Sequence, residues 1–455
     1  MKEKTVINGP VYDARTLGKS KMLILGLQHM FAMFGATVLV PILTGLDIAT
    51  TLLFAGLGTL LFHLLTKRKV PAFLGSSFAF IGGYNAIRQV GVDASGNAIY
   101  NNDLLIYACF GVACAGLMYV ILSALFKAFG VKKVMKFFPP IVTGPIIICI
   151  GLTLSSSAIT NCNANWLVAV AAIIIVIFFN IWGKGMAKIV PILIGVIGSY
   201  LISMVVDPAS RAKVVETVAA ADWLGLPINW DRTVFHLFNM EVDTGMLISA
   251  VLTIVPLSLA TMVEHIGDIC AISSTVGKNY VVDPGLHRTL LGDGLATTLA
   301  ALFGAPANTT YGENTGVLAL SKVFDPRVIR IAAVFAIIFS FCPKFAALIT
   351  AMPSATIGGI SLILYGMISA VGVRNVVENK VDFTNSRNVI VAALILVLAI
   401  GINYSVGSIQ IGIVSLSGLA VASLVGIAVN AILPGKDYEF GVDEQGDTSV
   451  NFVVR

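Results

Sequence analysis

The sequence predicts an all-α polytopic membrane protein of fourteen transmembrane segments, arranged as a 7+7 inverted repeat with two short antiparallel strands in segments 3 and 10. Apolar residues make up 57% of its 455 residues, charged residues only 12%, and the mean hydropathy is +0.91. A soluble fold cannot bury that much apolar surface. Two further observations define the class: long apolar runs that recur along the chain, and polar, glycine-bearing breaks at matching places in its two halves.

Hydropathy alone predicts twelve spans, because a helix needs about 20 apolar residues to cross the hydrocarbon core. These spans lie near residues 22–43, 49–66, 104–128, 134–156, 165–182, 188–206, 246–269, 289–304, 328–350, 354–372, 388–404 and 408–433.

Two more spans are interrupted, at residues 71–90 and 306–321. They open with the strand-like stretches PAFLGSSFAF and PANTTYGENT, which lie 235 residues apart, and each continues as a short helix. Each is long enough to cross as a strand plus a half-helix. Broken spans at corresponding positions of two halves are typical of a transporter's substrate site.

The distribution of Lys and Arg supports the count of fourteen, because these residues remain in cytoplasmic loops. With both termini inside, 24 of the 29 basic residues fall on the cytoplasmic side. Omitting either broken segment spoils this separation. The five basic residues left outside are Arg88, Arg211, Lys213, Arg232 and Lys344.

Seven predicted spans precede the polar stretch 207–245 and seven follow it, so the second half must insert upside down relative to the first. We expect residues 1–21 to be a cytoplasmic N-terminus without a signal peptide. Residues 207–245, with Trp223 and Trp230, are expected to form an extracytoplasmic loop, and residues 434–455 a loosely ordered cytoplasmic tail.

Ionisable residues inside the predicted spans are the main functional candidates, because a charge at the bilayer centre costs on the order of 3 kcal/mol. Glu264 and Asp268 are four residues apart and share a helix face. Two carboxylates held together in a low dielectric disfavour double ionisation, which is the signature of a proton site. The alternative is that they bond the backbone ends of the broken segments.

The second broken segment places Glu313 where its strand turns into a half-helix. A carboxylate is favoured there by the helix dipole, so a simple capping role is the alternative. Backbone amides at Phe78 and Gly312 would need a partner that a planar ligand could supply. The Phe78 ring could stack on a flat heterocycle, or it could be ordinary core.

Histidines offer weaker signals. His29 is a packing residue or a group that supports the site, and the 235-residue offset places it opposite Glu264. His63 and His265 are expected to be structural, since His265 must point about 100° away from Glu264 on its helix. Asp293 should face protein, and the sequence assigns it no role.

Several function classes are excluded by what the sequence lacks. It contains no phosphate-binding glycine loop, catalytic triad or metal-ligand cluster, so we expect no enzyme, no metal and no cofactor. Its +5 formal charge lies in short loops rather than a basic domain, which excludes nucleic acid as a partner. The six cysteines lie mostly in apolar runs and are expected to be packing residues.

Several motifs together resemble the bacterial uracil carriers of the nucleobase/ascorbate transporter family, also called nucleobase:cation symporters. They are QHMFAMFGATVLVPILTG, FLGSSFAF, VEHIGD, DPGLHR and APANTTYGENTGV. The family signature matches at Glu313, Asn314, Gly316 and Lys322, with Ser321 in place of Thr. The similarity runs across nearly the whole chain except its ends.

The resemblance implies a core domain of spans 1–4 and 8–11 (residues 22–128 and 246–350) and a gate domain of spans 5–7 and 12–14 (134–206 and 354–433). It also implies a homodimer in lipid, and a substrate site where the two strands cross. Glu264 and Glu313 would bind a pyrimidine, assisted by backbone amides at Phe78 and Gly312. His29 and Tyr311 would support them.

The expected function is import of uracil by proton symport, in an inner (plasma) membrane, through movement of the core against the gate. A uracil-transporting member has His where this chain has Asp268, so we expect the proton on Glu264, Asp268 and Glu313. The alternatives are a xanthine or purine symporter of the same family and an anion channel or exchanger of related fold. The anion alternative is disfavoured because buried carboxylates would repel an anion.

Overall fold

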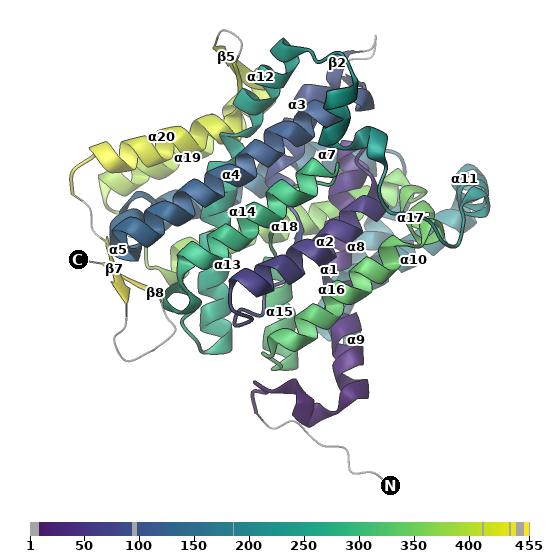
Figure 1. The fold of residues 1–455 in the computed structure, drawn as a ribbon, viewed down its shortest axis with the longest axis horizontal. Coiled ribbons are helices and arrows are strands. Elements are labelled where there is room, and N and C mark those ends of the chain that lie inside the picture. Colours follow the sequence, from purple (N-terminus) through teal and green to yellow (C-terminus); the bar gives the residue numbers. More distant parts are fainter. Residues whose placement is uncertain are drawn as a thin grey trace.

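The computed structural model describes residues 9–92, 98–184, 186–411, 414–435, 438–442 and 450–454, and helices dominate them (Figure 1). The first half contains α1 (Lys19–Thr44), α2 (Ile48–Leu65), β1 (Leu74–Ser76), η2 (Phe78–Phe80), α3 (Ile81–Arg88), α4 (Leu105–Phe129), α5 (Val131–Val134), α6 (Pro140–Thr153), α7 (Ser155–Cys162), α8 (Trp166–Trp182), α9 (Met186–Ile189) and α10 (Pro191–Val206). After α11 (Pro208–Ala220), the second half contains α12 (Thr244–Ile254), α13 (Leu257–Val276), α14 (Leu286–Leu302), β4 (Asn308–Thr310), α15 (Gly312–Ser321), α16 (Pro326–Ser340), α17 (Pro343–Thr350), α18 (Ser354–Glu378), α19 (Ser386–Ser405) and α20 (Gly418–Ile432).

Among the described residues, seven helices are long and apolar enough to cross a membrane, or nine if each of two bent pairs is one span. The bent pairs are α10 with α11, at 115°, and α16 with α17, at 88°. The count of fourteen stays a prediction. It also requires the shorter helices α8, α14 and α20 to cross, together with the two segments that combine a strand and a half-helix.

Large apolar side chains cover the outside of several helices. Ile174 and Phe178 on α8 are 59% and 52% exposed, and Val397 on α19 is 68% exposed. Water would penalise such surfaces, whereas lipid tails accommodate them. This is the exterior of an integral membrane protein.

The long helices pack in two sets. In one set α14 packs on α4 and α2, and α16 packs on α1 and α2. In the other, α18 packs on α6, α7 and α8, while α19 packs on α20 and α6. Figure 1 shows α19 and α20 side by side at one edge of the molecule. Whether the two sets move as a core and a gate remains a prediction.

The strands β1 and β4 form a two-stranded antiparallel sheet within the two segments that the sequence singles out. The register pairs Leu74 with Thr310, Gly75 with Thr309 and Ser76 with Asn308. One more bond lies at each end, from Ser77 N to Ala307 O (2.8 Å) and from Tyr311 N to Phe73 O (3.1 Å). The sheet therefore joins two segments that are far apart in the sequence.

Polar side chains from the surrounding helices satisfy backbone groups at the edges of this sheet. The Thr59 hydroxyl accepts from Leu74 N at 2.9 Å, and Ser76 Oγ donates to Thr37 O at 2.9 Å. His63 Nε2 donates to Ala72 O at 2.9 Å, and Thr297 Oγ1 donates to Asn308 O at 2.5 Å. Non-helical backbone is tolerated at membrane depth when protein groups replace water in this way. The structural role expected for His63 is the one observed.

The ends of the chain and its central loop contain more regular structure than the sequence indicates. The predicted loop 207–245 begins with the helix α11, and the predicted loose tail contains the paired strands β7 (Tyr438–Val442) and β8 (Val450–Val454). Two further hairpins join β2 (Gln89–Val92) to β3 (Ala98–Tyr100) and β5 (Ser408–Ile411) to β6 (Val414–Ser417). The span expected at 328–350 is broken before Pro343, because proline has no backbone N–H to donate within a helix.

Candidate functional site

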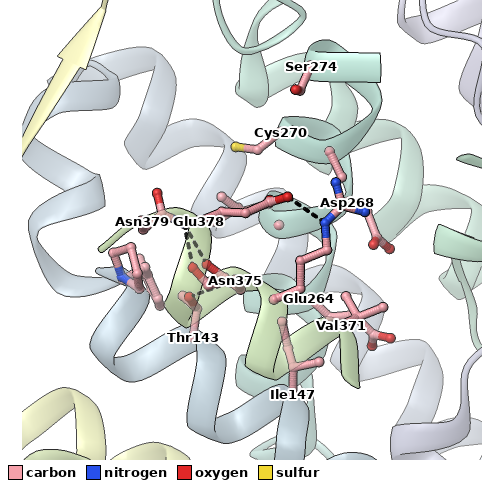
Figure 2. Close-up of a pocket in the computed structure, with 16 residues that line it drawn as sticks. Thr143, Ile147, Glu264, Asp268, Cys270, Ser274, Val371, Asn375, Glu378 and Asn379 are labelled. Atoms are coloured by element: carbon pink, nitrogen blue, oxygen red, sulfur yellow. Dashed lines mark hydrogen bonds and ion pairs between the residues drawn. The ribbon is translucent and has the colours of Figure 1, made fainter. Parts of the chain in front are cut away.

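A cavity of about 270 Å³ lies between α13 and the two helices α6 and α18 (Figure 2). Glu264, Asp268 and Cys270 line it from α13. Opposite them lie Thr143 and Ile147 on α6 and Val371, Arg374 and Asn375 on α18. The cavity is thus bounded by α13 on one side and by α6 and α18, which belong to the second set of helices, on the other. It is slightly smaller than the roughly 300–1,000 Å³ typical of small-molecule sites.

The two carboxylates predicted from α13 both line this cavity. Glu264 is half-buried and Asp268 is 6% exposed. An added Cβ at Gly312, the first residue of α15, would lie 3.2 Å from Asp268 Oδ1. The Asp268 carboxylate therefore sits beside the N-terminal end of α15, where backbone N–H groups lack partners within the helix. The spacing of four residues does place both carboxylates at one site.

Glu313 is the second residue of α15. Its side chain lies outside the part of the structure that is described, so the predicted meeting of Glu313 with Glu264 stays a prediction. Gly312 is the first residue of the helix, so its backbone N–H has no hydrogen-bond partner within the helix.

Phe78 follows β1 as the first residue of the short 3₁₀ turn η2, and its side chain is only 6% exposed. Its ring meets Tyr365 of α18 edge to face, with 5.8 Å between centroids and 81° between planes. This contact joins the sheet segment to the set of helices that contains α18. The Phe78 ring is thus already packed against an aromatic partner, in a geometry that aromatic pairs prefer.

The Tyr311 side chain bonds to the opposite strand of the two-stranded sheet. Its hydroxyl donates to Ser76 O at 2.8 Å, and its side chain is 3% exposed. An added Cβ at Gly75 would collide with the Tyr311 ring, so the glycine makes room for it. Tyr311 therefore ties β4 to β1, and its predicted part in substrate binding stays a prediction.

His29 lies on α1 with no exposed surface, and its ring faces Asn314 of α15. Asn314 follows Glu313 directly in the family signature. His29 and Asn314, which come from different halves of the chain, are therefore neighbours in the fold, whereas the predicted position of His29 opposite Glu264 stays a prediction.

Sequence reasoning missed a buried polar network next to the cavity. His265 Nδ1 lies 3.2 Å from Asp293 Oδ2, and neither side chain is exposed. The Thr310 hydroxyl lies 3.2 Å from the same His265 nitrogen and 3.5 Å from Asp268 Oδ2. The network runs from α14 through α13 and β4 to the cavity. The sequence did contain a signal for this network, because Asp293 and His265 both lie within predicted spans and ionisable residues there need partners.

Polar side chains of α18 form the other wall. Asn375 Nδ2 donates to the Thr143 hydroxyl at 3.0 Å, and Asn379 Nδ2 donates to Asn375 Oδ1 at 2.9 Å. Arg374 and Glu378 form an exposed ion pair at 2.6 Å, drawn as a dashed line in Figure 2. These groups lie at the C-terminal end of α18, where the sequence places the cytoplasm.

The arrangement suits a small, neutral, polar ligand. Ionised carboxylates accept hydrogen bonds, a protonated carboxyl also donates one, and amides at a helix start donate. Within the described residues no group of three or more His, Cys, Asp or Glu side chains could hold a metal ion.

Comparison with known proteins identifies the relatives of this chain. A model of the Permease family matches residues 20–407. The chain is 38% identical to the uracil permease of Bacillus subtilis over 439 residues, covering 93% of this chain and 94% of that protein. It is 39% identical to the uracil permease of Bacillus caldolyticus over 444 residues, covering 94% and 96% respectively.

Among solved structures, the transmembrane domain of the cyanobacterium bicarbonate transporter BicA matches with a TM-score of 0.53. The match covers 93% of this chain and 99% of that domain, at 15% identity. At this identity the likeness concerns the fold alone. The helices of this chain are therefore arranged broadly as in that domain.

Proposed function

The chain belongs to the Permease family, as its motifs predicted, and from that premise we propose that it imports uracil by proton symport. Its relatives are permeases and not enzymes, and membrane transport is the common activity. The single observation that carries the proposal is the cavity lined by Glu264 and Asp268, with Asp268 beside the start of α15.

The chemistry of uracil fits these groups. Its ring N–H groups would donate to a carboxylate, and its carbonyls would accept from a protonated carboxyl. The backbone amides at Phe78 and Gly312, which are not among the residues that line the cavity, would supply further donors in this proposal. Glu313, at the second position of α15, would supply a further carboxylate. Because an ionised carboxylate cannot donate, protonation of one carboxyl would complete the set of bonds. Substrate and proton would then occupy the site together.

Alternating access follows in this proposal from where the cavity lies. Its lining includes Arg374 and Asn379 at the end of α18 that the charge distribution places inside. The contact between Phe78 and Tyr365 would close the site on the opposite side. The structure would therefore correspond to an inward-open state, and import would require α6 and α18 to move against α13.

Uptake of labelled uracil into proteoliposomes tests this function. We expect uptake that depends on an imposed proton gradient, proceeds without sodium, and is lost in the double variant Glu264→Gln, Glu313→Gln. Uptake that ignored collapse of the proton gradient would contradict the coupling, and wild-type uptake by the double variant would contradict the site. Stronger competition by xanthine than by unlabelled uracil would instead identify a purine carrier.

A further inference from the structure

A second cavity, of about 950 Å³, lies away from the proposed uracil site, where the N-terminal segment meets the ends of α2, α13 and α16. Its lining is strongly basic. Arg68, Lys69, Lys278, Arg327 and Arg330 face it, against only two carboxylates, Asp283 and Asp325. The lining thus carries a formal excess of three positive charges.

The two lining carboxylates already have cationic partners. Lys69 Nζ lies 2.5 Å from Asp283 Oδ2. Arg327 Nη1 lies 3.1 Å from Asp325 Oδ2 and also 2.9 Å from Asp13 Oδ1. The Lys278 ammonium lies 4.6 Å from the centre of the Tyr12 ring, an attractive cation–π contact.

Arg68 and Arg330 are the cations left over. Among the described residues neither forms an ion pair, and Arg330 Nη1 is buried without a hydrogen-bond partner. The two guanidinium groups are close enough to repel each other. The Asp325 carboxylate attracts Arg330 and offsets part of this repulsion, but it is already paired with Arg327. A planar fork of N–H donors matches the oxygens of a phosphate group, which would supply further negative charge.

We propose that this cavity is a binding site for a phosphate group, with Arg68 and Arg330 as its principal donors. The phosphate has two possible sources: a free anion such as inorganic phosphate or a nucleotide, or the headgroup of an anionic lipid. Tyr12 also lines the cavity and could contact the rest of either ligand. The alternative is that these residues are ordinary cytoplasmic charges, which would bind no anion specifically.

The test is a thermal-unfolding and calorimetric titration of the full-length protein in two arms. In neutral detergent, inorganic phosphate and uridine 5′-monophosphate are titrated against chloride at equal ionic strength. In nanodiscs, phosphatidylcholine alone is compared with phosphatidylcholine containing phosphatidylglycerol. Stabilisation by a soluble anion identifies a free ligand, and stabilisation by phosphatidylglycerol alone identifies a lipid headgroup.

The double variant Arg68→Gln, Arg330→Gln should weaken the response about tenfold or more, because it removes two charge-assisted contacts. Without ligand it should be at least as stable as the wild type, since the repulsion is gone. Lys127→Gln, an exposed charge on α4 that does not line the cavity, is the matched control and should respond like the wild type. If the double variant is not obtained folded, Arg68→Gln alone, on an exposed side chain, serves the same comparison.

The proposal is overturned if neither soluble phosphate probe stabilises the wild type beyond chloride and phosphatidylglycerol does not stabilise it beyond phosphatidylcholine alone. It is also overturned if the arginine variants respond as the Lys127→Gln protein does. Binding is measured without uracil, so a failure of the proposed transport function would not be mistaken for a failure here.

Discussion

The His265 ring lies 3.2 Å from the Asp293 carboxylate, and both side chains are completely shielded from solvent. The pair joins α13, which carries Glu264 and Asp268, to α14. Through the Thr310 hydroxyl it reaches Asp268 at the cavity. Asp268, one of the two carboxylates at the cavity, is therefore connected through Thr310 to a buried imidazole and a second buried carboxylate.

Loss of either member of the His265–Asp293 pair should lower the stability of the folded protein. Asp293→Asn and His265→Gln should each destabilise the protein by about 3 kcal/mol or more, because each leaves a buried partner uncompensated. The double variant should lose less than the sum of the single losses. Thermal unfolding of the wild type and the three variants in one detergent gives a double-mutant cycle. Strictly additive losses of stability would show that the two residues do not interact.

The Thr310 hydroxyl should couple the protonation of the His265–Asp293 pair to that of Asp268. Thr310→Val keeps the shape of the side chain and removes the hydroxyl, so we expect slower uracil transport with a shifted pH dependence. Thr310→Ser retains the hydroxyl and is the control that should resemble the wild type. Equal pH profiles for the Val and Ser variants would rule out the hydroxyl as a link.

The ring contact between Phe78 and Tyr365 should matter for affinity. Phe78→Ala removes this ring pair and also the ring that could stack on uracil. A stacking contact worth about 0.5–1.5 kcal/mol would make uracil binding roughly twofold to tenfold weaker in the variant. Tyr365→Phe keeps the ring and removes only its hydroxyl, and it should bind uracil nearly as the wild type does. Equilibrium binding of labelled uracil measures both. An unchanged uracil affinity in Phe78→Ala would show that Phe78 does not contribute to uracil binding.

The link from Tyr311 to Ser76 should hold the two strands in place. Tyr311→Phe removes a buried hydrogen bond of 2.8 Å and should cost about 1–3 kcal/mol of stability, with weaker uracil binding. Tyr404→Phe removes a similar bond to Leu152 O at an exposed position and is the matched control. If both variants unfolded at the same temperature, the sheet would not depend on Tyr311.

The sequence predicts much of this fold because the membrane imposes strong patterns. Long apolar runs such as the one that forms α4 follow from hydropathy. The broken stretches near Pro71 and Pro306 stand out because polar residues are rare at membrane depth, and both contain the observed strands. Interrupted helices are harder to foresee, since the bend between α16 and α17 depends on one proline within an apolar run.

The site is predicted less completely than the fold. A spacing of four residues places Glu264 and Asp268 on one helix face, and both line the cavity. The same periodicity directed attention away from His265, whose face meets Asp293 of another helix. Partners that come together only through tertiary packing, such as Phe78 with Tyr365, leave no local pattern in the sequence.

The most direct test of the central claim is the pH inside sealed proteoliposomes when uracil is added outside without an imposed gradient or sodium. If uracil and a proton enter through one site, the lumen should acidify with wild-type protein and not with Glu264→Gln. Uracil accumulation measured in the same vesicles without acidification would contradict the account.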